Sequence, residues 1–277
     1  MRDLRIPRGV AIAKVVVQMP RFAANISLLW PELGFLERIA QASSAGFQAV
    51  ECQFPYAFSA SELAARLADQ GLVQVLHNLP AGDWAAGERG IACIPGREAE
   101  FRDGVGLALT YAQALDVPTL NCLAGLTPPG VPAERVRETL VENLRFAAAA
   151  LAAVGRTLTV EPLNTRDVLG FHLHGSRQTL ELLDQVGADN VRLQYDVYHM
   201  QVMEGDLTRT LQREMPRIGH IQIADNPGRG EPGTGEIHFP FLLAAIDAAG
   251  YSGWIGCEYL PRTTTDAGLA WLDPYRP

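Results

Sequence analysis

Four strand-like segments in the second half of this sequence end in side chains that carry oxygen. The run Thr157 to Glu161 ends in a carboxylate, the run Val191 to Asp196 ends in a second, and the run Trp254 to Glu258 ends in a third. Gln222 lies near the end of a further run at 218–224. Carboxylate and amide oxygens at neighbouring strand ends are the donors with which proteins hold a hard divalent cation.

Side-chain alternation decides which of these residues face one another. Residues two apart on a strand share a face, and the alternate, helix-facing positions are apolar: Leu158, Val160, Leu193, Ile221, Ile223 and Ile255. Three carboxylates on the opposite face would raise one another's pKa values unless a cation relieved the repulsion. Because these donors are oxygens and not Cys or His, we predict an Mg²⁺ or Mn²⁺ site with the ligands Glu161, Asp196, Gln222 and Glu258.

Each of these residues also has a purely structural interpretation. A carboxylate that ends a strand commonly caps the next helix, and a lone Gln is more often a hydrogen-bonded core amide than a ligand. Because three strands end in a carboxylate on the same face, we favour one shared site over three independent structural roles. Asp225 is a further candidate from the seventh strand, but it falls on the outward phase. We therefore interpret Asp225 as a loop or cap residue.

Other polar side chains lie in loops directly after these strands. Asn164 follows Glu161, and His199 follows Asp196 closely enough to orient a substrate oxygen. A histidine bonded only to backbone is the structural alternative for His199. Arg229 lies in a Gly/Pro-rich loop, where an arginine suits a carboxylate on the substrate; a solvated loop charge is the alternative.

A long segment after the third predicted strand is expected to border the site. His77 and Asn78 end that strand, and we assign His77 to substrate binding. The segment 79–96 follows and contains Trp84 and Arg89. Loops of this length in a compact domain are usually functional or disordered. We interpret it as a lid or wall over the mouth of the site, with an oligomer contact as the alternative.

Strands and helices alternate along the whole chain. Strands are expected near residues 22–27, 48–53, 73–78, 118–122, 157–161, 191–196, 218–224 and 254–259. Helices are expected at 34–44, 59–70, 97–115, 132–154, 176–186 and 239–249, with Ser59 and Ser176 as N-caps. Alternation implies parallel pairing, and eight such units in roughly 250 residues predict an α/β fold, a single (β/α)8 TIM barrel.

An open doubly wound sheet is the alternative architecture. No Gly-x-Gly-x-x-Gly follows the first strand, which disfavours its dinucleotide-binding form. No linker-like stretch divides the chain, so we expect residues 19–277 to form one catalytic domain. Residues 1–18 contain an apolar run that is interrupted by Lys14 and is too short to span a membrane. We expect them to be an N-terminal extension outside the fold.

Composition narrows the class of protein further. The formal net charge of −8 over 277 residues argues against a surface built for nucleic-acid phosphates. The four cysteines are widely spaced, and nothing resembles a secretion signal, which favours reduced thiols in the cytoplasm. We therefore expect a cytoplasmic protein with a small-molecule substrate and no nucleic-acid or membrane partner. Assembly into a homo-oligomer is left open.

Four motifs around the predicted site carry a family resemblance. They are Glu161-Pro162-Leu163-Asn164, the run 194–201, the run 219–227 and Gly256-Cys257-Glu258-Tyr259. With these motifs the sequence resembles hydroxypyruvate isomerase, within the wider group of xylose-isomerase-like barrels. The match also covers 77–90, 95–98 and 263–269, and so spans nearly all of the chain from Met19. One departure is Ala57-Phe58, where similar proteins often carry Asp and Tyr.

The resemblance implies a function. It indicates a metal-dependent isomerase that interconverts hydroxypyruvate and 2-hydroxy-3-oxopropanoate (tartronate semialdehyde), a small hydroxy-keto acid pair, through an enediolate. The family's Glu, Asp, Gln and Glu ligands fall on Glu161, Asp196, Gln222 and Glu258, and the two glutamates are its proton-transfer pair. A 2-oxo-tetronate isomerase or a ketose epimerase would use the same centre.

Two alternatives come from other functional classes. A DNA-repair endonuclease on such a barrel would need a histidine-rich zinc cluster and a basic surface, whereas this chain has six histidines and a negative net charge. A non-catalytic sugar-acid binding protein would have little use for two glutamates on a metal.

Overall fold

A closed barrel of eight parallel strands forms the centre of the molecule. The computed structural model describes residues 20–276. Each strand pairs with its neighbours in sequence order, and the last pairs with the first. The strands are β1 (Arg21–Asn25), β2 (Ala49–Glu51), β3 (Val73–Asn78), β4 (Thr119–Cys122), β5 (Thr157–Val160), β6 (Val191–Asp196), β7 (Ile218–Ile223) and β8 (Trp254–Cys257).

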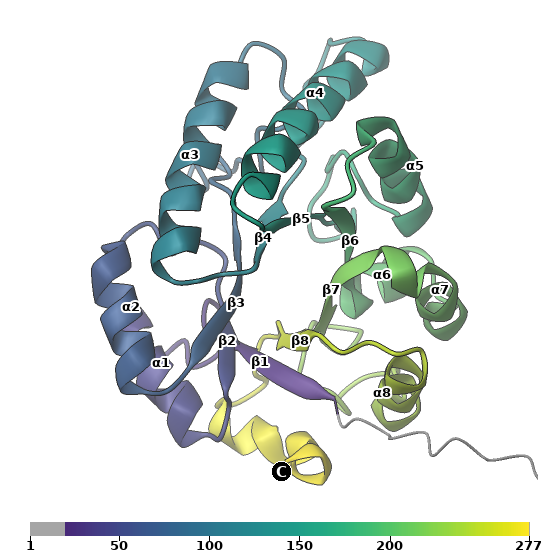
Figure 1. Cartoon of the computed structure of the whole chain (residues 1–277). Helices are drawn as coiled ribbons and strands as arrows, with labels where there is room; N and C mark the ends of the chain where they lie inside the picture. Colours follow the sequence, from purple (N-terminus) through teal and green to yellow (C-terminus); the bar gives the residue numbers. More distant parts are fainter. Residues whose placement is uncertain (1–19, 277) are drawn as a thin grey trace, which may run out of the picture.

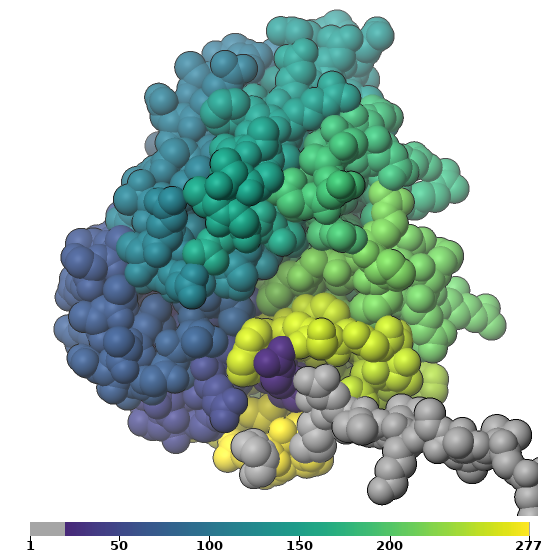
Figure 2. All heavy atoms as spheres, viewed as in Figure 1, coloured from purple at the N-terminus to yellow at the C-terminus, as the bar shows by residue number. Residues whose placement is uncertain are grey.

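Helices surround the strands in a ring (Figure 1). They are α1 (Phe35–Ser44), α2 (Ala60–Asp69), α3 (Glu98–Ala114), α4 (Ala133–Ala152), α5 (Ser176–Val186), α6 (Val197–Met203), α7 (Leu207–Glu214) and α8 (Phe239–Ala248), with 3-10 turns η1 (Met215–Arg217) and η2 (Asp266–Tyr275). The colours in Figure 2 pass around the ring in chain order. The (β/α)8 barrel predicted from the sequence is thus confirmed. The predicted N-terminal extension, residues 1–18, lies outside the described residues.

All eight predicted strands and all six predicted helices are present, and their ends differ from the prediction by a few residues at most. The sequence prediction missed α6 and α7. α6 begins immediately after the last residue of β6, with Asp196 as its N-cap, so no loop signal separates strand from helix. Within residues 20–276, no helix combines the length and the hydropathy needed to cross a bilayer.

One of the two predicted N-caps is correct. The Ser59 side chain accepts a hydrogen bond from the backbone N–H of Glu62 at the start of α2. At α5 the N-cap is Gly175, not Ser176. The Glu204 carboxylate accepts bonds of 2.7 Å from both the backbone N–H and the hydroxyl of Ser176. A carboxylate distant in the sequence therefore takes the place of the local cap.

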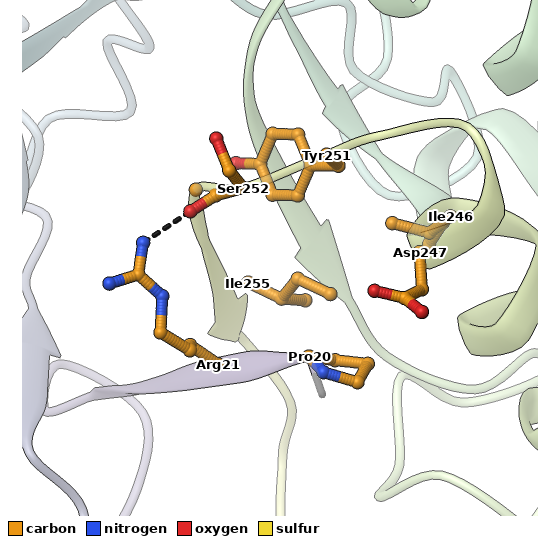
Figure 3. Close-up of a pocket in the computed structure, with 8 residues that line it drawn as sticks. Pro20, Arg21, Ile246, Asp247, Tyr251, Ser252 and Ile255 are labelled. Atoms are coloured by element: carbon orange, nitrogen blue, oxygen red, sulfur yellow. Dashed lines mark hydrogen bonds between the residues drawn. The ribbon is translucent and has the colours of Figure 1, made fainter. Parts of the chain in front are cut away.

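The barrel closes between β1 and β8, where Arg21 lies opposite Trp254. The Arg21 guanidinium stacks 4.7 Å from the centroid of the Trp254 ring and donates a hydrogen bond to the backbone carbonyl of Ser252 (Figure 3). The small pocket drawn in Figure 3 lies beside this junction, and Asp247 is the one carboxylate in its lining. It opens where strands begin, whereas the predicted site lies where strands end.

The barrel interior is polar next to the carboxyl ends of the strands. Glu51 of β2 is fully buried. Its carboxylate accepts hydrogen bonds from Asn25 at 2.9 Å and Gln222 at 2.8 Å, and it lies 2.7 Å from Nε2 of His220. A Cβ atom at Gly256 would lie 2.4 Å from both Glu51 carboxylate oxygens. Gly256 therefore leaves the space that this network fills.

We expect Gly256→Ala to lower the free energy of unfolding by about 1–3 kcal/mol, because an added methyl group displaces a buried, hydrogen-bonded carboxylate. Thermal and chemical unfolding measure this change. Gly106→Ala in α3 is the matched control: a Cβ there meets no atom within 4 Å, and alanine favours the helix, so stability should stay equal or rise. Equal stabilities of the two variants would contradict the prediction.

Candidate active site

A cavity of about 100 Å³ lies at the carboxyl ends of the strands. Its lining includes three of the four predicted ligands, Glu161, Gln222 and Glu258, together with His199 and Arg229. Asp196, the fourth, is fully buried. It lies within 3.2 Å of the Arg229 guanidinium. The structure therefore brings these four residues from four consecutive strands to one end of the barrel.

The two glutamates are each held by one oxygen. Oε2 of Glu161 accepts hydrogen bonds from Asn121 at 2.9 Å and from Gln194 at 3.1 Å. Oε1 of Glu258 accepts a bond of 2.9 Å from Gln53. The other oxygen of Glu161 receives no hydrogen bond from any residue of 20–276. Glu161 thus keeps one oxygen available for other partners, whereas the second oxygen of Glu258 accepts a hydrogen bond of 2.9 Å from Arg229.

Asp196 divides its two oxygens in the same way. Oδ1 accepts the backbone N–H groups of Tyr198 at 2.8 Å and His199 at 3.4 Å and so caps α6. Oδ2 contacts the guanidinium of Arg229 at 3.2 Å. Asp196 therefore acts as a helix cap through one oxygen, while its other oxygen faces Arg229.

Arg229 connects two of the carboxylates. Its Nη2 lies 3.2 Å from Oδ2 of Asp196 and 2.9 Å from Oε2 of Glu258. Its Nε donates to the backbone carbonyl of Glu258 at 3.2 Å. The residue adopts φ +56°, a left-handed conformation that side chains other than glycine rarely adopt. These contacts hold a positive charge directly between two negative groups.

Burial raises the pKa values of all three carboxylates, and repulsion from neighbouring site carboxylates adds to the shift for Glu161 and Glu258. The pKa of Glu161 lies well above its ordinary value because of burial first, then the charges of Glu258 and Asp196. Burial likewise raises the pKa of Asp196, with Arg229 opposing the shift. For Glu258, burial raises the pKa to about 7, again against the effect of Arg229. A group such as Glu258, which ionises near neutrality, is suited to proton transfer.

His199 is a neutral hydrogen-bond donor in this arrangement. Burial, followed by the charge of Arg229, lowers its pKa well below the ordinary value. Nδ1 accepts the backbone N–H of Asn164 at 3.1 Å, so the ring proton must be on Nε2. Nε2 lies 3.6 Å from Oδ2 of Asp196 and 3.9 Å from Oε1 of Glu161. The histidine therefore presents an N–H to the same space as the carboxylate oxygens.

The donor set fits a hard divalent cation. Ligand atoms of Glu161, Asp196 and His199 lie within 4.8 Å of one another. Because the protonated Nε2 of His199 has no free lone pair, the carboxylates are the better ligands. The Gln222 amide is oriented on both sides: Oε1 accepts from Gln194 at 2.7 Å and Nε2 donates to Glu51 at 2.8 Å. Its carbonyl oxygen keeps a second lone pair for a cation.

His77 lies outside the cavity, whereas Asp225 lies in the loop position predicted for it. Nε2 of His77 is 3.3 Å from the backbone carbonyl of Ala108 in α3, and His77 does not line the cavity, whereas its neighbour Asn78 does. We therefore remove His77 from the candidate substrate-binding residues. Asp225 accepts the backbone N–H groups of residues 226, 233, 235 and 237, which confirms its role in organising a loop.

Several residues that hold the site carboxylates and Gln222 in place were not predicted from the sequence. Asn121 and Gln194 contact Glu161, Gln53 contacts Glu258, and Glu51 contacts Gln222. Gln194 lies two residues before Asp196, so the same phase rule could have identified it. The segment 79–96 supplies Trp84 and Arg89 to the cavity, which agrees with its interpretation as a wall.

Fold and site together define a barrel enzyme whose acidic centre suits a divalent cation and a small-molecule substrate. Residues 39–275 match the family model described as xylose isomerase-like TIM barrel. The chain therefore belongs to this family.

Two relatives indicate which enzymes of the family resemble this chain. The chain is 57% identical to hydroxypyruvate isomerase of Escherichia coli (strain K12) over 93% of this chain and 100% of that one. It is 51% identical to 2-oxo-tetronate isomerase of Cupriavidus necator, over 93% and 99% of the two chains. These likenesses make the protein an isomerase.

A solved structure extends the comparison. The crystal structure titled AP endonuclease, family 2, from Brucella melitensis superposes with a TM-score of 0.91 at 49% identity, covering 94% of this chain and 100% of that one. More distant structures, such as L-ribulose 3-epimerase at 24% identity and a TM-score of 0.73, share the fold.

We expect the protein to lose stability as the pH rises from about 5 to about 7 when a chelator has removed divalent ions. The folded pKa of Glu258 is about 7, against 4.5 for an ordinary glutamate. Between these values the folded state holds a proton that the unfolded chain has released, so the free energy of unfolding falls with rising pH.

Thermal unfolding of the chelated protein at a series of pH values measures this slope. Glu258→Gln removes one titrating group and should flatten it. His77, His172 and His199, whose lowered pKa values contribute with the opposite sign, are present in both proteins and cancel in the comparison. Identical slopes for the two proteins would refute the pKa assignment. Added Mg²⁺ or Mn²⁺ should also flatten the slope, because a bound cation displaces the proton.

Proposed function

We propose that this protein interconverts hydroxypyruvate and 2-hydroxy-3-oxopropanoate. The observation that carries the proposal is the pair of buried glutamates, Glu161 and Glu258, which line one cavity and whose pKa values burial raises above the ordinary value. The relative that is 57% identical bears the name hydroxypyruvate isomerase.

The reaction moves one proton between carbons and one between oxygens. A glutamate removes a proton from C3 of hydroxypyruvate and leaves an enediolate across C2 and C3. The second glutamate delivers a proton to C2, while the O3 hydroxyl proton passes to O2. Glu161 suits these steps because its Oε1 accepts no hydrogen bond from residues 20–276. Glu258 suits them because its pKa is about 7 and its Oε2 contacts a side chain, that of Arg229. In the reverse direction the two groups exchange roles.

Glu161, Asp196, Gln222 and Glu258 are the residues that would hold a cation, with Mg²⁺ or Mn²⁺ preferred for oxygen donors. When bound, the cation polarises the substrate carbonyl and stabilises enediolate charge. His199 donates from Nε2 to a substrate oxygen, and Asn164 fixes the tautomer that allows this. Arg229 balances the charge of Asp196 and Glu258.

Glu161→Gln and Glu258→Gln should each lower kcat for hydroxypyruvate by at least about 10²-fold, because general acid–base groups contribute on the order of 10²–10⁴. Stopped assays of aldehyde product in the presence of Mg²⁺ or Mn²⁺ measure the loss. Glu142→Gln, at an exposed position of α4, is the control and should retain full activity. Near wild-type turnover by both site variants would defeat the assignment.

Asp196→Asn should bind Mn²⁺ at least about tenfold more weakly while remaining folded. Asparagine is as good an N-cap as aspartate, so the Oδ1 contacts that begin α6 persist. The charge on the other oxygen is lost, and with it an ionic ligand. Isothermal titration with Mn²⁺ and far-UV circular dichroism provide the two measurements. Unchanged Mn²⁺ affinity in a folded variant would remove Asp196 from the ligand set.

A 2-oxo-tetronate isomerase is the second candidate, because a relative that is 51% identical carries that name. It would use the same residues with one more carbon in the substrate. Assays of hydroxypyruvate and 2-oxo-tetronates side by side, with and without metal, separate the two. An oligonucleotide with an abasic site in the same series tests for nuclease activity.

A further inference from the structure

Two arginines line the cavity, and their surroundings differ. Arg229 lies against Asp196 and Glu258. Arg89, which the segment 79–96 contributes to the same cavity, has no carboxylate of residues 20–276 within salt-bridge distance. The charge of Arg229 is thus balanced within the protein, whereas the charge of Arg89 is not.

The contacts of Arg89 orient it and leave part of its guanidinium free. Its Cζ lies 4.0 Å from the centroid of the Trp84 ring. Its Nη1 donates to the backbone carbonyls of Trp84 at 3.1 Å and Glu88 at 2.7 Å. Nε and Nη2 donate to no residue of 20–276. The neighbouring acid, Glu88, pairs with Arg97 instead. Stacking and one nitrogen therefore position the group, and two donors stay available.

The backbone beside Arg89 is fixed by close packing. Gly90 donates its N–H to the carbonyl of Ala81 at 2.9 Å. A Cβ atom at Gly90, which has φ +112°, would lie 2.2 Å from the backbone oxygen of Leu123. Two residues farther on, the carbonyl of Ala92 accepts a bond of 2.9 Å from Asn143. A guanidinium on such a wall is held in place before any ligand arrives, which reduces the entropy cost of binding.

We propose that Arg89 binds the carboxylate of the substrate and makes this site select hydroxy-keto acids over neutral ketoses. The inference rests on the proposed function and deepens it. A substrate anion would be repelled by three buried carboxylates, so the cavity needs a cation whose charge is not already balanced. The planar fork of Arg89 matches a carboxylate. Arg229, predicted from the sequence for this role, serves the protein's own carboxylates instead.

Two ligands that differ only at the relevant group test the proposal. Dihydroxyacetone carries the carbonyl and hydroxymethyl groups of hydroxypyruvate with CH₂OH in place of the carboxylate. Arg89→Gln should raise KM for hydroxypyruvate, and its Kd by isothermal titration, by about 10- to 100-fold, the range of a charge-assisted hydrogen bond. The Kd for dihydroxyacetone should stay within about twofold, and Arg89→Lys should recover part of the loss.

Two further variants sharpen the test. Arg102→Gln, at an exposed arginine of α3, is the control and should match the wild type. Arg229→Gln separates the two arginines. An unchanged Kd for hydroxypyruvate in Arg89→Gln, or equal loss of affinity for both ligands, overturns the proposal. So does a carboxylate-specific loss that appears in Arg229→Gln and not in Arg89→Gln.

Failure of the proposed function gives a different pattern. If the wild type binds hydroxypyruvate without converting it, the isomerase assignment fails, and the Kd comparison still decides the role of Arg89. If the wild type converts hydroxypyruvate and Arg89→Gln has the same KM as the wild type, the isomerase function is supported and the proposed role of Arg89 is contradicted. A wild type that binds no hydroxy-keto acid overturns both.

Discussion

Repulsion among three buried carboxylates is the constraint on which the rest of this structure depends. Glu161, Asp196 and Glu258 lie at one end of the barrel, and burial raises the pKa of each. Such a cluster would not keep its geometry in an apolar core, because each charge would seek water or a proton. The interior beneath it is accordingly built of amides and other hydrogen-bonding side chains, among them Asn121 and Gln194.

Backbone and amide groups hold one oxygen of each carboxylate, and Arg229 contacts the second oxygen of Asp196 and of Glu258. The same residues can therefore serve both the fold and the site. Asp196 ends β6 and begins α6 with one oxygen while the other faces Arg229. Gln222 donates to Glu51 and accepts from Gln194, so its amide cannot rotate freely. Preorganisation of this kind lowers the reorganisation that chemistry would otherwise require.

Two glycines show how tightly the barrel supports the site. Gly256 leaves room for the Glu51 carboxylate, and Gly90 allows the wall segment to approach the backbone of Leu123. The first close approach supports the amide of Gln222 from within the barrel. The second sets the position of Arg89 at the rim. In both places the absence of a side chain allows a functional group to be placed.

The sequence by itself determined the barrel and the four strand-end residues. Strand and helix periodicity is local, and side-chain phase alone puts Glu161, Asp196, Gln222 and Glu258 on the inner face. Tertiary structure decided which partners those residues have. Gln53 reaches Glu258 across 205 positions and Glu204 caps α5 from 28 positions away, and no local pattern records such contacts. His77 is different, because it faces α3 while its neighbour Asn78 faces the cavity, and side-chain alternation along β3 is a local rule that the sequence already contains. Tertiary structure likewise decides that, within residues 20–276, the charge of Arg229 is paired with carboxylates and that of Arg89 is not, because the folded chain brings Asp196 and Glu258 next to Arg229.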